Sequence, residues 1–182
     1  MKKLITGIVE FRQKARLNYL KKFAHLALNQ SPDALLIACS DSRVVPNVFA
    51  STNPGDLFVV RNIGNLLPPC PMHTSIAIGE SEAAALEFSL QNLPIRNIII
   101  CGHSECGAMQ AILSQSPDRN SSLSGWLRHA HHAFERLDSI EQFLSHYPAE
   151  PHNQLSQLNV LQQLAHLETY PLIRKKNYRR NA

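Results

Sequence analysis

The chain of 182 residues lacks several features that would assign it to a particular class of protein. It has no run of about eighteen apolar residues, so we expect no transmembrane helix and no membrane partner. Lys2 and Lys3 stand near the N-terminus, but no long apolar stretch with a small-residue cleavage site follows them. A secretory signal is therefore not expected, and we predict a cytoplasmic protein.

Cysteine is scarce, with four residues in the chain, and their positions do not suggest disulfides. Cys39 and Cys106 belong to a metal-binding pattern that is described below. Cys101 ends an apolar run, and Cys70 lies in a proline-rich segment. This usage fits a reducing compartment, in agreement with a cytoplasmic location.

The net charge is +4, and much of the excess lies in two patches near the ends of the chain. These patches are residues 2–22 and 174–180. The middle of the chain has no basic stripe with interleaved aromatic residues, which nucleic-acid binding would favour. A solvated surface explains the charge more simply, so no nucleic-acid partner is expected.

Length and composition predict one domain, and the order of the predicted elements predicts the α/β class. With 44% hydrophobic residues, the chain can form one sizeable core but not two comfortable ones. Strand and helix patterns alternate, which favours a mostly parallel central sheet flanked by helices. Strands are predicted at residues 34–39, 57–61 and 97–101. Helices are predicted at residues 2–29, 44–49, 80–93, 106–113, 123–137, 139–146 and 154–168.

Two cysteines and a histidine follow two of the predicted strands. Cys39 ends the first strand, and His103 and Cys106 come just after the third. Ligands collect beyond the carboxyl ends of parallel strands, where strands separated by a crossover can be neighbours. Two thiolates and one imidazole fill three corners of a zinc tetrahedron, and a catalytic zinc keeps the fourth corner open. We predict one Zn²⁺ per chain here, although each residue taken singly is more often ordinary packing.

Three segments carry a resemblance to a known family. CSDSR at residues 39–43, PGDLFVVRNIGN at 54–65 and CGHSECGAM at 101–109 resemble the signature blocks of the β-class carbonic anhydrases, in their plant-like and bacterial subgroup. The resemblance extends over residues 1–173. It implies a zinc lyase, a carbonate dehydratase, that reversibly hydrates CO2 to bicarbonate and a proton through zinc-bound hydroxide.

The resemblance assigns catalytic roles to Asp41 and Arg43. Asp41 would orient the zinc-bound hydroxide, or bind zinc as a fourth ligand in a closed state, and Arg43 would hold it off the metal. Without the neighbouring ligand, the two would be an ordinary surface pair worth less than about 1 kcal/mol. Leu36 and Ala38 replace the residues of an allosteric bicarbonate pocket found in another subgroup. We therefore expect an open site with Asp41 paired to Arg43.

Four further residues are implied to bind the substrate. The amide of Gln30 would donate a hydrogen bond to CO2 or bicarbonate, although by itself Gln30 is only a polar residue at a helix end. Phe58, Ile63 and Phe88 would form an apolar wall, with core packing as the ordinary alternative. Phe88 replaces a tyrosine that is common in the family.

The resemblance also implies a homodimer or larger homo-oligomer, with the N-terminal helix reaching across to the partner. We expect residues 1–30 to form this dimer-embracing arm, 31–173 the zinc-binding α/β core and 174–182 a basic tail. Family members usually continue into a further strand, so the chain looks shortened at its C-terminus. An uncovered sheet edge would favour association.

Two other functions remain open at this stage. The chain could be a zinc-binding relic or interaction protein with impaired catalysis, or a related hydrolase of carbonyl sulfide or carbon disulfide. His129 and His132 are predicted to share an exposed or interface face of a helix rather than a second metal site. No proton shuttle is assigned.

Overall fold

The structure is a computed structural model, and it describes residues 1–71, 81–118, 120–137 and 150–178. The chain divides into two compact units, Met1–Ser31 and the chain from Pro32 onward. No helix within the described residues is long and apolar enough to cross a membrane.

The first unit is helical, as predicted for residues 2–29. Helix α1 (Lys2–Glu10) continues through a π-helical turn (Phe11–Ala15) into α2 (Arg16–Leu26). Three aromatic rings pack in series, because Tyr19 lies 6.3 Å from Phe11 and 5.6 Å from Phe23 between ring centroids. Many apolar side chains of this unit are exposed, including Leu4, Ile5, Ile8, Leu17 and Leu20.

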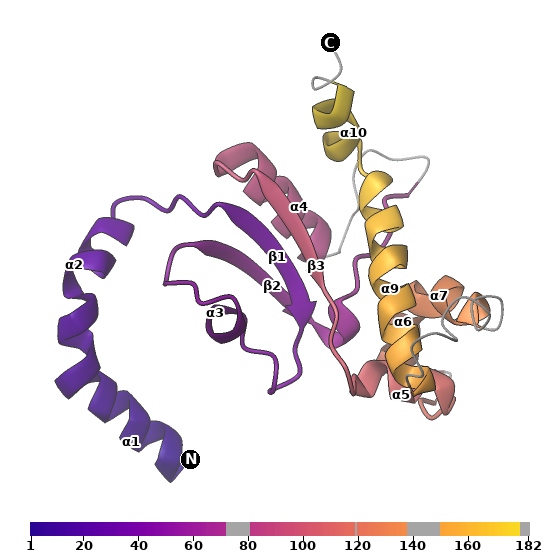
Figure 1. Cartoon of the computed structure of the whole chain (residues 1–182), viewed down its shortest axis with the longest axis horizontal. Helices are drawn as coiled ribbons and strands as arrows, with labels where there is room; N and C mark the ends of the chain where they lie inside the picture. The colour runs from indigo at the N-terminus through magenta and orange to yellow at the C-terminus, as the bar shows by residue number, and fades with distance from the viewer. Residues whose placement is uncertain (72–80, 119, 138–149, 179–182) are drawn as a thin grey trace. The chain divides into compact units, whose positions relative to one another are not determined.

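The second unit is built on a three-stranded parallel sheet, which confirms the predicted fold class. The strands are β1 (Ala34–Cys39), β2 (Leu57–Asn62) and β3 (Asn97–Cys101), in the order β2-β1-β3 (Figure 1). Helix α4 (Ser81–Asn92) lies between β2 and β3 in the sequence. Every residue of β1 is buried, as expected for a central strand covered on both faces.

The two faces of the sheet carry separate hydrophobic clusters. Leu36 and Ala38 point into one cluster, and Leu35 and Ile37 point into the other, because successive side chains of a strand alternate between faces. Strand β3 pairs with β1 alone among the described residues, and Ile99 on this edge is 43% exposed.

The remaining helices differ in part from the prediction. The short helix α3 (Pro46–Phe49) and α5 (Gly107–Leu113) occur where expected. The predicted helix 123–137 is wrong as a single element: α6 (Ser122–Leu127), a 3₁₀ turn (Arg128–Ala130) and α7 (His131–Glu135) replace it. Ser121 caps the N-terminus of α6, since its hydroxyl accepts a hydrogen bond from the backbone N–H of Ser124 at 3.1 Å. The predicted helix 139–146 lies outside the described residues.

Helix α9 (Pro151–Glu168) begins three residues before its predicted start at 154, with proline in its first turn. It contributes Leu155 to the first hydrophobic cluster and Leu167 to the second. Helix α10 (Pro171–Tyr178) follows, in a segment for which only a tail was expected beyond residue 173.

A buried hydrogen-bond network ties α9 to the segment after β2. The Asn159 side-chain amide donates to the carbonyl of Gly64 at 3.0 Å. Gln163 accepts from the backbone N–H of Leu67 at 2.8 Å, and it donates to Asn159 and to the carbonyl of His129. Helix α9 is therefore held both by apolar packing and by polar contacts that leave few alternatives for its position.

Candidate metal centre

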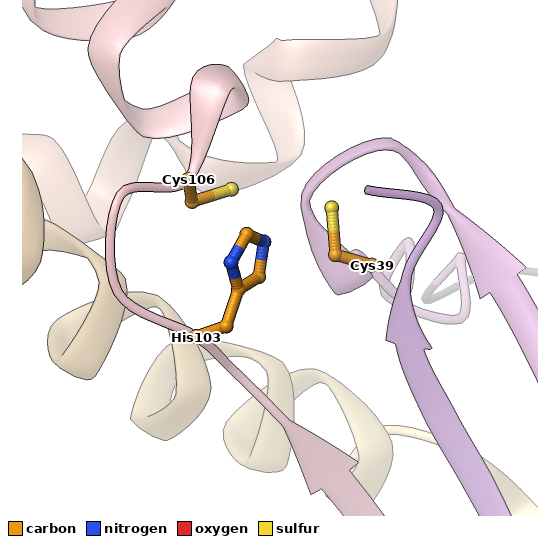
Figure 2. Close-up of side chains that lie close together, drawn as sticks. All are labelled: Cys39, His103 and Cys106. Carbon is orange, nitrogen blue, oxygen red and sulfur yellow. The ribbon is translucent and has the colours of Figure 1, made fainter. Parts of the chain in front are cut away.

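Cys39, His103 and Cys106 come together as predicted, at the carboxyl ends of β1 and β3. Their ligand atoms all lie within 4.8 Å of one another. Figure 2 shows the three side chains converging from two loops, with the imidazole between the sulfur atoms. The parallel pairing causes this convergence, because Ala38 aligns with Cys101 and both strands end beside each other.

The imidazole of His103 is arranged as a metal ligand. Its Nδ1 lies 2.8 Å from the carbonyl oxygen of Ser104. A carbonyl can only accept, so Nδ1 carries the proton and the lone pair is on Nε2. Nε2 is buried and has no hydrogen-bond partner among the described residues. An unsatisfied buried acceptor between two sulfurs is what a metal cation would satisfy.

The thiol of Cys39 is the easier of the two to ionise. Its sulfur accepts a hydrogen bond from Cys106 and from the backbone N–H groups of Asp41 and Gly64, at 3.5 and 3.4 Å. These donors lower the pKa of Cys39, the Cys106 contact having the largest effect. The contact with Cys39 has the opposite effect on Cys106, and together with burial it raises the pKa of Cys106.

Close packing around two glycines fixes two segments of the site, the turn after β2 and the loop after β3. Gly64 has a φ of +78°, and a Cβ there would lie 3.1 Å from the Cβ of Ala108. A Cβ on Gly102, just before His103, would lie 2.7 Å from Cγ2 of Val160 in α9. Both segments therefore need a residue without a side chain at these positions.

Asp41 and Arg43 form a two-pronged pair beside the cluster. Arg43 Nε donates to Asp41 Oδ1 at 2.9 Å and Nη2 donates to Oδ2 at 2.7 Å, while the Arg43 backbone N–H also reaches Oδ1 at 2.9 Å. These hydrogen bonds hold the pKa of Asp41 well below its usual range. Arg43 Nη2 also donates to the carbonyl of Glu105 at 2.8 Å, which links the two ligand loops.

Arg61 is a residue near the site that sequence reasoning did not assign. Its Nε donates to the carbonyl of Cys39 at 3.1 Å, and its Nη2 donates to the carbonyl of Asp41 at 2.7 Å. These contacts hold the turn that follows β1. An arginine near the carboxyl end of an otherwise apolar strand was the available signal.

Of the four predicted substrate-binding residues, two lie in contact with each other. Phe58 and Phe88 face each other, with ring centroids 5.9 Å apart. Ile63 is 46% exposed, and its carbonyl accepts a hydrogen bond from the Trp126 indole at 2.8 Å. Gln30 belongs to the first unit. The roles of these four residues in substrate binding stay predictions.

The histidine segment near α7 differs from the exposed face that was predicted. His131 and His132 both lie near the carboxylate of Glu135, at 3.6 and 2.9 Å. His129 instead lies in the 3₁₀ turn, where its ring contacts Trp126 edge-on and is half-buried. His129 is therefore less exposed than His131 and His132.

The donor set as a whole fits one zinc ion. Two cysteine sulfurs and an unprotonated imidazole nitrogen are borderline-soft ligands that zinc prefers, and three protein ligands leave one position open. Among the residues that the structure describes, this is the one such group of potential ligands.

Comparisons with known proteins show the family of the chain. A family model described as carbonic anhydrase matches residues 34–181. The carbonic anhydrase of Synechocystis is 38% identical over 182 residues, covering 98% of this chain and 64% of its own length. That of Pseudomonas aeruginosa is 38% identical, covering 95% of this chain and 76% of its own length. The structure of the beta-carbonic anhydrase CcaA matches with a TM-score of 0.85 and 36% identity, over 98% of this chain and 78% of that one.

The chain therefore belongs to the carbonic anhydrase family, and to its β class. It also spans only part of several relatives. It covers 37% of the beta carbonic anhydrase 1 of Caenorhabditis elegans and 63% of the carbonic anhydrase of Synechococcus elongatus.

Proposed function

We propose that this chain catalyses the zinc-dependent, reversible hydration of CO2 to bicarbonate and a proton. The observation that carries the proposal is the convergence of Cys39, His103 and Cys106 beside a carboxylate held by an arginine. A structural zinc site would use four protein ligands, whereas this cluster leaves one position for a reacting molecule.

The three ligands would hold the ion and the neighbouring residues would prepare the reaction. Bound zinc supplies Lewis-acid chemistry, because it lowers the pKa of water in its open position to about 7. Asp41 is kept ionised by Arg43, so it can accept a hydrogen bond but cannot donate one. Arg43 occupies both carboxylate oxygens, which opposes movement of Asp41 onto the metal.

The substrate would lie against an apolar surface. The adjacent rings of Phe58 and Phe88 are suited to CO2, which is small and has no hydrogen to donate. Within this proposal Ile63 extends that surface, and the amide of Gln30 donates to an oxygen of CO2 or bicarbonate. A cytoplasmic location, expected from the sequence, is part of the same proposal.

A homo-oligomer is the partner that we propose. Helices α1 and α2 contain no buried residue within their own unit, and they carry a row of exposed apolar side chains. Such a row needs a covering surface in water. Two β-carbonic anhydrases from Sordaria macrospora are described as tetrameric; one matches with a TM-score of 0.78 and 27% identity, over 100% of this chain and 88% of that chain. Sedimentation of the purified chain tests the proposal, and a fully active monomer would contradict it.

Zinc analysis combined with stopped-flow CO2 hydration tests the main proposal. We expect about one zinc ion per chain and measurable hydration, both of which Cys39→Ser should abolish. Cys70→Ser is the matched control, because it makes the same change at another buried cysteine that lies outside the cluster. Zinc without hydration would indicate a binding protein instead. Turnover of carbonyl sulfide or carbon disulfide with none of CO2 would indicate the related hydrolase.

A further inference from the structure

Glu105 lies between two of the predicted zinc ligands in an unusual backbone conformation. Its φ is +55°, in the left-handed region that residues with a side chain adopt with some strain. His103 precedes it by two residues and Cys106 follows it directly. The direction in which both ligands point therefore depends on what holds Glu105 in this conformation.

All polar groups of Glu105 are engaged, Oε2 by the amide of Gln110 at 3.4 Å, and two residues of α9 supply most of the other contacts. The backbone N–H of Glu105 donates to Asn153 Oδ1 at 2.7 Å. Its carboxylate Oε1 accepts from Asn153 Nδ2 and from His152 Nε2, each at 2.9 Å. Its carbonyl accepts from Arg43 Nη2 at 2.8 Å. The side chain of Asn153 thus holds Glu105 by two hydrogen bonds, one to its backbone N–H and one to its carboxylate.

Helix α9, which carries His152 and Asn153, is itself held firmly in place by packing and hydrogen bonds. Leu155, two residues after Asn153, is fully buried, and Val160 contacts the Gly102 side of the same loop. Further along, Asn159 and Gln163 hold the segment after β2. The first turn of α9 is therefore fixed relative to the sheet that carries the ligands.

We propose that Asn153, assisted by His152, is a positioning residue that fixes the conformation of the loop carrying His103 and Cys106 by holding Glu105. Through the Glu105 carbonyl it also fixes the position of the Arg43 guanidinium. The inference rests on the proposed zinc function. Neither residue is expected to contact zinc or substrate. Residues that hold metal ligands in place typically affect metal affinity by about 10- to 100-fold. Loss of the Asn153 contacts should therefore increase the rate at which the protein releases zinc.

The test uses an exchange of donor and acceptor in the zinc-loaded full chain. Asn153→Asp keeps the acceptor for the Glu105 N–H but sets a second carboxylate against Oε1. The double variant Glu105→Gln with Asn153→Asp restores a donor and an acceptor with their roles reversed, and His152, which also contacts this atom, can accept from the new amide through its other tautomer. An acidic residue in the first turn suits a helix N-terminus, so the substitution should not weaken α9 itself. Gln157→Ala is the matched control, since Gln157 lies one turn later and its side chain forms no hydrogen bond among the described residues.

Zinc release to a chromogenic chelator is measured for each protein, with the visible spectrum of the cobalt-substituted form as a second readout. We expect Asn153→Asp to release zinc about 10-fold faster or more and to change the cobalt spectrum, while the double variant and Gln157→Ala behave like the wild type. Equal release by Asn153→Asp and Gln157→Ala, or no recovery in the double variant, would overturn the inference and leave the proposed function intact. A wild-type chain without zinc would overturn both. Thermal unfolding checks that each variant is folded.

Discussion

Arg43 holds Asp41 by two parallel hydrogen bonds of 2.9 and 2.7 Å, and the same guanidinium reaches the Glu105 carbonyl at 2.8 Å. One side chain therefore connects the loop after β1 with the loop after β3. The two loops carry all three predicted zinc ligands. A change in the position of the Arg43 guanidinium should therefore affect both loops of the site.

Arg43→Lys should impair catalysis while leaving zinc bound. A lysine ammonium is a single point of charge and cannot form the planar fork that engages two carboxylate oxygens. We expect CO2 hydration to fall by about 10-fold or more, with zinc content unchanged because the ligands are intact. Stopped-flow hydration and metal analysis measure the two effects. Arg96→Lys, at an exposed position before β3, is the control, and full activity of Arg43→Lys would contradict the role given to the fork.

Gly102→Ala should destabilise the fold. The new Cβ would meet Cγ2 of Val160 at 2.7 Å and the carbonyl of Ser156 at 3.4 Å. Overpacking of this kind costs about 1–3 kcal/mol, which urea unfolding can measure. Gly107→Ala is the control, because nothing lies within 4 Å of a Cβ there.

Adding Val160→Ala to Gly102→Ala separates overpacking from other effects. Removing Cγ2 clears the closest contact, so the double variant should be more stable than the sum of the single effects predicts. Simple additivity of the two free-energy changes would show that the clash is not the cause.

Gln163→Ala should be among the costly substitutions in α9. Gln163 is fully buried, and its amide serves the Leu67 N–H, the His129 carbonyl and Asn159. Each buried group left without a partner costs about 1–3 kcal/mol, so we expect a loss above about 2 kcal/mol. The exposed Gln157→Ala should change the free energy of unfolding by less than about 0.5 kcal/mol. Similar effects of the two substitutions would refute the importance of the network.

His129 should make the protein less stable as the pH falls. Burial, with smaller contributions from Arg128 and His166, lowers the pKa of His129 to about 4, whereas an unfolded histidine titrates near 6.5. Between these values the unfolded chain binds the additional proton, so stability decreases from about pH 6.5 toward pH 4. Because the ring is only half-buried, solvent screening limits the effect to about 1 kcal/mol.

His129→Phe tests this pH dependence, since it keeps a ring beside Trp126 and removes the titrating group. Over that pH range the free energy of unfolding should fall by about 1 kcal/mol less in the variant than in the wild type. The difference is the relevant quantity, because metal ligands also take up protons in acid. His131→Phe, at an exposed position, is the control, and equal flattening by both would contradict the assignment.

Local sequence patterns were sufficient to predict the strands of the sheet and the metal ligands that follow them. The apolar runs that predict β1 and β3 are short and uninterrupted, and the soft ligands follow them within a few residues. A parallel crossover then brings strand ends together without further information. The break at residues 128–130 was missed, because a 3₁₀ turn of three residues is too short to show an apolar period of its own.

The sequence by itself determined which residues could hold a metal, since ligand chemistry depends on residue type and on position after a strand. Only the tertiary structure decided what holds those ligands in place. Asn153 lies 48 residues from Glu105, and Gln163 lies 96 residues from Leu67. Hydrogen bonds over such separations depend on where α9 packs against the sheet, and no local pattern of residues encodes that placement.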